Sequence, residues 1–125
     1  MSRGIEAKDK LEHIFLLQEH FDSELVRQRG LADISLEEWV QKEVLAILVE
    51  LGELLEEVNY KWWKNPKPIN REALKEEVVD ILHFLISLCL KAGIGAEELY
   101  EGYLAKNAEN FRRQRGESTK EGYKI

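Results

Sequence analysis

Two pairs of acidic residues set in apolar helical segments constrain this chain more than any other feature. Glu50 and Glu53 lie in LVELGELLEEV, and Glu77 and Asp80 lie in LKEEVVDILHF. Each pair has the spacing i, i+3, which places both carboxylates on one face of an α-helix. The second pair enters the most apolar stretch of the chain, residues 78–90. A carboxylate in such a stretch costs several kcal/mol unless it is neutralised. We therefore expect a divalent cation between two facing helices.

The apolar spacing predicts an all-α fold, a four-to-five-helix bundle. The expected helices cover residues 5–29, Ser35 to about Tyr60, Asn70 to about Lys91, and Ala96 to about Arg113. The segment KWWKNPKPIN breaks the pattern with two prolines and is expected to form a loop. The third helix has apolar residues around most of its circumference, which predicts a central, buried helix.

Composition limits the class of protein. A chain of 125 residues, 44% hydrophobic, is expected to form a single domain over residues 1–125, with a flexible tail from about residue 114. Its N-terminus does not resemble a signal peptide, and its longest apolar run is too short to span a bilayer. We expect a cytoplasmic protein with no membrane partner. The net charge of −6 argues against nucleic acid as a partner.

The distribution of charge is more informative than its sum. Residues 35–60 contain seven acidic residues and one Lys, whereas residues 106–125 contain six basic and three acidic residues. An acidic half that could hold metal and a basic end that could hold an anion suggest a metal–phosphate ligand. Mg²⁺ is the expected ion, with Mn²⁺ as a substitute, because Mg²⁺ binds carboxylates together with substrate phosphates. Glu53 or Glu57 could then act as general base.

Self-association is also expected. Leu45 and Val49 lie on the side of the second helix opposite its main apolar arc, so a second surface needs cover. A monomer of this size has difficulty supplying that cover, which favours a homodimer or homotetramer.

The spacing of the acidic pairs resembles a known family. Glu50-x-x-Glu53 and Glu77-x-x-Asp80, with 23 residues between the pairs, look like the signature of the all-α nucleoside triphosphate pyrophosphohydrolases, which include MazG-type enzymes. More specific features resemble the dimeric-type dUTPase branch: LVELGEL, the KWWK loop, VDILHFLISL, KNAENFRRQ and a late GY. The resemblance covers roughly residues 10–123. It implies hydrolysis of dUTP to dUMP and pyrophosphate at Mg²⁺ held by the four acids.

The resemblance also implies a set of substrate-binding residues. By this resemblance, Gln18 would contact the uracil. Trp63, with Lys64 beside it, would be the aromatic residue of the base pocket, and Phe84, next to His83, would contact the deoxyribose. An amide offers a donor and an acceptor to a base edge, and an aromatic beside the 2′ carbon leaves no room for a hydroxyl. The alternatives are a hydrogen-bonded core role for Gln18 and His83, and core packing or an oligomer interface for the tryptophans.

The residues expected to bind the phosphates lie near the C-terminus. Lys106, Asn107, Asn110 and Arg113 share one helical face, and their basic groups could neutralise triphosphate oxygens. Tyr123 lies in a tail that could close over bound nucleotide. The alternative is that the basic residues merely balance an acidic protein.

Two rival functions stay open at this point. The chain is shorter than the longer dimeric dUTPases between its third and fourth helices, so a related enzyme acting on dCTP or on a broader set of nucleotides is the first rival. A non-catalytic helical assembly protein with structural acids is the second.

Overall fold

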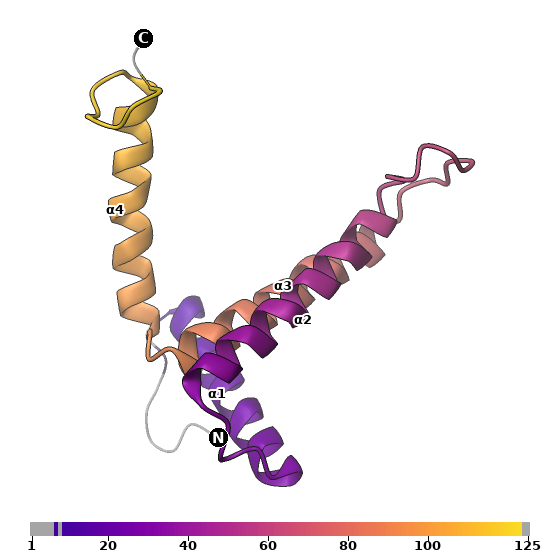
Figure 1. Ribbon diagram of the computed structural model, residues 1–125, viewed down its shortest axis with the longest axis vertical. Helices are drawn as coiled ribbons and strands as arrows, with labels where there is room; N and C mark the ends of the chain where they lie inside the picture. Colours follow the sequence, from indigo (N-terminus) through magenta and orange to yellow (C-terminus); the bar gives the residue numbers. More distant parts are fainter. Residues whose placement is uncertain (1–6, 8, 124–125) are drawn as a thin grey trace. The chain divides into compact units, whose positions relative to one another are not determined.

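The computed structural model describes residue 7 and residues 9–123, and this part of the chain contains four α-helices and no strand (Figure 1). The helices are α1 (Lys10–Arg29), α2 (Leu36–Glu56), α3 (Arg71–Lys91) and α4 (Ala96–Gln114). The predicted all-α class is confirmed. No single helix here is long and apolar enough to cross a membrane, and only α3 and α4 taken together, across the break between them, meet that criterion of length and composition.

Side-chain caps fix where the helices begin. Ser35 accepts a hydrogen bond from the backbone N–H of Glu38 (3.2 Å), and Asn70 caps α3 in the same way, both as predicted. The first helix starts at Lys10 rather than at residue 5, because Asp9 accepts the N–H of Glu12 and so caps the helix there. Residue 5 itself lies outside the described part of the chain.

The loop after α2 also begins earlier than expected. The prediction ran to Tyr60, but α2 ends at Glu56. Asn59 has φ = 56°, in the left-handed region that interrupts a helix, and its side chain exchanges two hydrogen bonds with the backbone of Lys67 (2.8 and 2.9 Å). This clasp closes the loop over residues 57–70.

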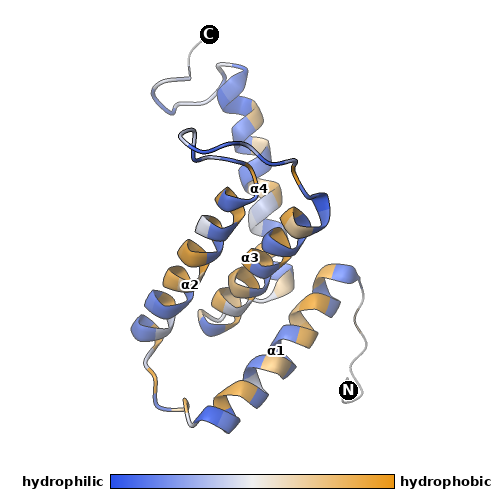
Figure 2. Ribbon diagram, turned by 90° about the vertical axis from the view of Figure 1, so that its right-hand side faces the viewer, coloured by the Kyte–Doolittle hydropathy of each residue, from blue (hydrophilic) through white to orange (hydrophobic). Residues whose placement is uncertain are grey.

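α2 and α3 form an antiparallel hairpin, and α1 packs against α3 (Figures 1 and 2). The predicted central position of α3 is therefore confirmed. Its predicted burial is not observed in the single chain: Ile86, Ser87 and Cys89 are buried, but Asp80 and His83 are exposed. Within the first unit α3 is covered by α1 and α2, and these two helices leave one of its faces open.

Large apolar side chains remain exposed as a result. Among the described residues, the buried apolar side chains are Phe15, Ile86 and Cys89. On α2, Leu45, Leu48 and Val49 are each more than half exposed (56–61%). Trp62 and Trp63, in the loop, are exposed by 85% and 59%, so neither packs in a core of this chain.

The chain divides into two compact units, one ending at Gly93 and one beginning at Ile94. The first unit contains α1, α2 and α3. The second contains α4 and the residues after it. The prediction of one domain over residues 1–125, with a flexible tail, stays a prediction.

Candidate metal and nucleotide site

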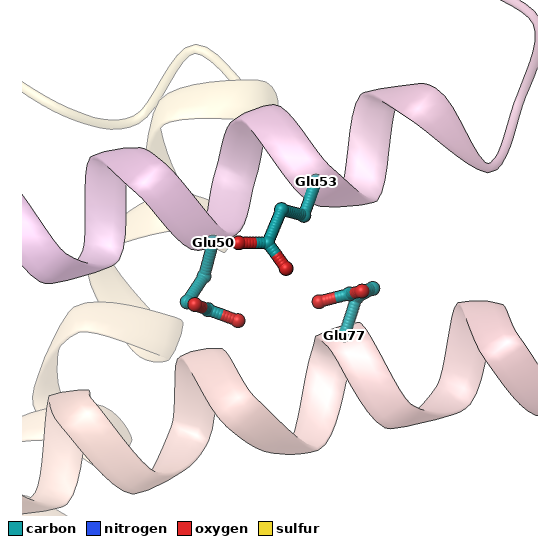
Figure 3. Close-up of side chains that lie close together, drawn as sticks. All are labelled: Glu50, Glu53 and Glu77. Atoms are coloured by element: carbon teal, nitrogen blue, oxygen red, sulfur yellow. The ribbon is translucent and has the colours of Figure 1, made fainter.

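The antiparallel pairing of α2 and α3 brings acidic side chains from both helices together. Glu50 and Glu53 of α2 point toward Glu77 of α3, and one carboxylate oxygen from each lies within 4.8 Å of the others (Figure 3). These three residues are called the acidic cluster below. Asp80, one turn further along α3, lies close enough for its charge to act on Glu50. The i, i+3 spacing thus produces the predicted convergence.

Two oxygens of the acidic cluster lack partners. Oε1 of Glu50 and Oε1 of Glu77 are buried and accept no hydrogen bond from any residue that the structure describes. Each such oxygen costs about 1–3 kcal/mol when it remains unsatisfied. In the described part of the chain, neither the acidic cluster nor Asp80 forms an ion pair with a basic side chain. The charge of this site is therefore not neutralised by any described Lys or Arg.

The electrostatics of the cluster favour proton uptake when no cation is present. Loss of hydration, and after it the negative charges of Glu53, Asp80 and Glu77, raise the pKa of Glu50 to about 6. Loss of hydration, followed by the charges of Glu53 and Asp80, also raises the pKa of Glu77. A divalent cation would oppose both causes.

This donor set fits a hard divalent cation. Mg²⁺ prefers oxygen ligands and is usually held by a few carboxylates, with water or phosphate completing its coordination. The acidic cluster offers carboxylate oxygens alone, two of them unsatisfied. Mn²⁺ accepts the same ligands.

A pocket of about 380 Å³ begins beside the acidic cluster. We call it the inner pocket; α1, α2 and α3 all contribute to its wall. The lining residues are Gln18, Phe21, Asp22, Leu25, Val26, Trp39, Lys42, Glu43, Ala46, Asp80, His83, Phe84, Ser87 and Lys91. Three residues predicted to bind the nucleoside, Gln18, His83 and Phe84, therefore lie together next to Asp80.

Hydrogen bonds fix the orientation of Gln18. Its Nε2 donates to Oδ1 of Asp22 (2.9 Å), and its Oε1 lies 2.8 Å from Nδ1 of His83. A carboxylate can only accept, so the amide nitrogen faces Asp22 and the amide oxygen faces His83. The Nδ1 of His83 is then the donor. One donor and one acceptor position of Gln18 are thus already used by the protein.

A second polar group also lines the inner pocket, seven residues along α3 from Asp80. Ser87 Oγ lies 2.5 Å from Oε2 of Glu43 and 2.8 Å from Oδ2 of Asp22. The ammonium of Lys91 lies 3.4 Å from each of these two oxygens, and 4.2 Å from the ring centre of Trp39.

The sequence analysis assigned no function to this group. Two kinds of signal were present in the sequence. Gln18 with Asp22, and Ser87 with Lys91, have the spacing i, i+4, and Glu43 lies two helical turns before Glu50 on the same face of the helix. Such spacings are common on solvated helices, so they carried little weight without the partner helix.

Trp63 and Lys64 lie elsewhere, in the loop between α2 and α3. They line a separate cavity of about 560 Å³ together with Tyr60, Lys67 and neighbouring residues, and they are absent from the wall of the inner pocket. The Trp63 ring meets those of Trp62 and Tyr60 edge to face. In the single chain the structure does not bring these residues together with Gln18.

The predicted phosphate-binding residues lie in the second unit. Lys106, Asn107 and Asn110 are exposed on α4. Arg113 donates to Glu109 (3.0 Å), and its guanidinium carbon lies 5.6 Å from the ring centre of Tyr123. Hydrogen bonds from Ser118 and Arg112, together with the one from Arg113, lower the pKa of Glu109 to about 2. The structure therefore pairs Arg113 with the segment that follows α4.

Comparison with known proteins supplies two relatives of this chain. The chain is 32% identical over 74 residues to the dCTP pyrophosphatase of Enterobacteria phage LZ5, which covers 59% of this chain and 43% of the phage protein. It is 31% identical over 87 residues to the dCTP pyrophosphatase of Enterobacteria phage T4, which covers 58% of this chain and 51% of that protein. The chain thus spans about half the length of these curated relatives. No solved structure matches it significantly.

A family model gives the wider assignment. The model described as dUTPase matches residues 10–95, which contain α1, α2, α3, the acidic cluster and the whole wall of the inner pocket. The match covers more than half of the chain and includes both acidic pairs from which the resemblance was inferred. This protein belongs to the dUTPase family.

Proposed function

We propose that this protein is a Mg²⁺-dependent pyrophosphohydrolase that converts a pyrimidine deoxyribonucleoside triphosphate to its monophosphate and pyrophosphate. The family description indicates dUTP as the substrate. The observation that carries the proposal is the convergence of Glu50, Glu53 and Glu77 within 4.8 Å, with two buried oxygens unsatisfied. Such a group lowers the stability of the fold until a cation or a proton offsets its charge.

Each part of the first unit has a separate task in this proposal. Glu50, Glu53, Glu77 and Asp80 would hold the cation. When bound, Mg²⁺ neutralises phosphate charge and lowers the pKa of a bound water. An acid near this water that does not itself bind the cation, Glu53 or Glu57, would accept the proton of the attacking water. Glu53 is the exposed member of the acidic cluster.

The inner pocket would hold the nucleoside. On α3, Asp80 and Ser87 are seven residues apart, which corresponds to about 10 Å of helix. Both line the pocket, so a nucleoside whose phosphates lie at Asp80 would extend its base toward Ser87. Phe84 lies between them on the same helix, also lines the pocket, and would contact the sugar.

dCTP is the second candidate substrate. Both phage relatives are named dCTP pyrophosphatases, and their matches cover more than half of this chain. The polar residues of the inner pocket bear on this choice.

The partners and the location of the protein are part of the proposal. The exposed apolar side chains of α2 favour a homodimer or homotetramer. We also propose that Mn²⁺ can replace Mg²⁺ and that the protein is located in the cytoplasm. In such an assembly, Trp63 or the C-terminal residues could reach the site of a neighbouring copy.

The test measures pyrophosphate release from dUTP, dCTP, dTTP and UTP in the presence and absence of Mg²⁺. We expect release that requires Mg²⁺ and favours deoxyribonucleotides over UTP. Glu77→Gln should reduce kcat by about 100-fold or more, because one cation ligand and one charge are lost. Glu76→Gln, an exposed acid one residue away, is the matched control and should retain activity. Wild-type rates for Glu77→Gln, or no product from any nucleotide, would reject the proposal in favour of a non-catalytic assembly protein.

A further inference from the structure

The far end of the inner pocket contains more hydrogen-bond acceptors than donors. Ser87 Oγ faces a carboxylate oxygen of Glu43 and one of Asp22, yet a hydroxyl has a single hydrogen. At any moment one of these two contacts therefore lacks a hydrogen. Lys91 is the one cation in this group, and it is shared between the same two oxygens at 3.4 Å each. With both acids ionised, Asp22, Glu43 and Lys91 together carry a net charge of about −1.

These carboxylates line the pocket. The side chains of Asp22 and Glu43 are 13% and 7% exposed, and both contribute to the wall of the inner pocket. The amide nitrogen of Gln18 donates to Oδ1 of Asp22, which leaves Oδ2 directed to Ser87 and Lys91. A carboxylate offers about four acceptor positions, and these contacts occupy at most three on Asp22. A ligand with an N–H group can use the remaining position.

The pyrimidine bases differ at the position that such an acceptor would distinguish. Cytosine carries an amino group on C4, which donates two hydrogens, whereas thymine and uracil carry a carbonyl oxygen there. A carbonyl oxygen next to two carboxylates meets repulsion, and the three hydrogens of the Lys91 ammonium are already directed to Asp22, Glu43 and Ser87. An amino group in the same place can donate to the acceptor position of Asp22 that the protein leaves unused.

We propose that Asp22, supported by Glu43 and Ser87, selects cytosine over uracil by accepting a hydrogen bond from the 4-amino group of the base. This inference rests on the proposed function, since it assumes that the inner pocket holds the base while the phosphates lie at the acidic cluster. Asp22 also positions Gln18, because it accepts a hydrogen bond from the amide nitrogen of Gln18 and so directs the amide oxygen toward His83. dCTP is then the preferred substrate.

A change in the substrate tests the inference on the unaltered protein. The triphosphate of 2-pyrimidinone deoxyribonucleoside lacks the 4-amino group but is otherwise close to dCTP. We expect its kcat/KM to be lower than that of dCTP by about tenfold or more, the effect of losing a hydrogen bond to a charged acceptor. We expect dUTP to fall below dCTP by at least as much. dATP, which also carries an amino group on a larger base, should be a poorer substrate than dCTP.

A change in the protein tests the same contact from the other side. Asp22→Asn replaces one acceptor oxygen with a donor nitrogen, which suits the uracil O4. The ratio of kcat/KM for dCTP to that for dUTP should fall by about tenfold or more. Glu19→Gln, an exposed acid on the same helix, is the matched control and should leave this ratio unchanged. Circular dichroism and thermal melting report whether each variant is folded.

The outcomes separate this inference from the proposed function. If the wild-type protein hydrolyses no nucleotide, the proposed function fails. If it hydrolyses dUTP or dATP in preference to dCTP, or accepts the 2-pyrimidinone substrate as well as dCTP, the proposed function stands and the role of Asp22 is rejected. If Asp22→Asn does not fold, the comparison of substrates on the wild-type protein decides the question alone.

Discussion

At the scale of single residues, the acidic cluster stores unfavourable electrostatic energy when no cation is bound. Glu50 illustrates this, because its Oε1 is buried without a hydrogen bond from the described residues and three neighbouring carboxylates repel its charge. Functional sites commonly contain groups whose pKa is displaced in this way. The displacement can be measured without a substrate.

The first prediction concerns the pH dependence of stability. The pKa of Glu50 is about 6 in the folded protein and ordinarily 4.5, so the folded state binds more protons between these values. The metal-free protein should therefore lose stability as pH rises from about 4.5 to above 6. Glu50→Gln removes this term and should raise the free energy of unfolding above pH 7 by about 1 kcal/mol after solvent screening, a few degrees in melting temperature.

Mg²⁺ provides the internal control. It should raise the melting temperature of the wild-type protein at pH 8, because it binds the folded state, and should have little effect on Glu50→Gln. Equal stabilisation of both proteins by Mg²⁺ would place the cation elsewhere.

At the scale of elements, the loop at the end of the α2–α3 hairpin depends on one side chain. Asn59 adopts a positive φ and exchanges two hydrogen bonds with Lys67, which holds the aromatic and basic residues of the loop in place. Asparagine tolerates the left-handed conformation better than most residues. The loop conformation is therefore encoded at a single position.

The second prediction follows from this clasp. Asn59→Ala should lower the free energy of unfolding by about 1–2 kcal/mol, since it removes two hydrogen bonds and keeps the unfavourable φ. Proteolysis should then cut the loop faster. Asn65→Ala, in the same loop, is the control. If Asn59→Ala is cut no faster than the control, the clasp does not hold the loop.

The sequence allowed much of this architecture to be predicted, for local reasons. Ser35 and Asn70 cap their helices through contacts within three residues, so the pattern alone sufficed. The i, i+3 spacing of the acids likewise indicated their shared face. The link between Asp22 and Ser87 joins residues 65 positions apart and depends on how α1 packs on α3. That packing has no local signature, so the polar group around Ser87 could not be predicted.

At the scale of the whole molecule, exposed apolar surface is the dominant feature. Leu45, Leu48 and Val49 of α2 are more than half exposed, as the position of Leu45 and Val49 on the helix had suggested. Large exposed apolar patches mark contact surfaces. Homo-oligomerisation stays a prediction.

The third prediction tests it. Leu45→Glu should reduce the mass measured by light scattering from that of a dimer or tetramer toward that of the 14.6 kDa chain. It should also lower the melting temperature at a fixed protein concentration, because association stabilises the folded state. Gln41→Glu, an exposed polar position on α2, adds the same charge and should leave the mass unchanged. A wild-type mass of one chain would remove the basis for an assembly.

The antiparallel register of α2 and α3 has a consequence for how such a chain can vary in length. Glu53 faces Glu77 and Glu43 faces Ser87, so one alignment of the two helices sets every one of these pairs. Adding a single residue within either helix would rotate everything beyond it by about 100° and separate all the pairs past that point together. The loop over residues 57–70 can gain or lose residues without this effect. Insertions and deletions in natural variants should therefore fall in the loop over residues 57–70 or outside α2 and α3, and not within these two helices.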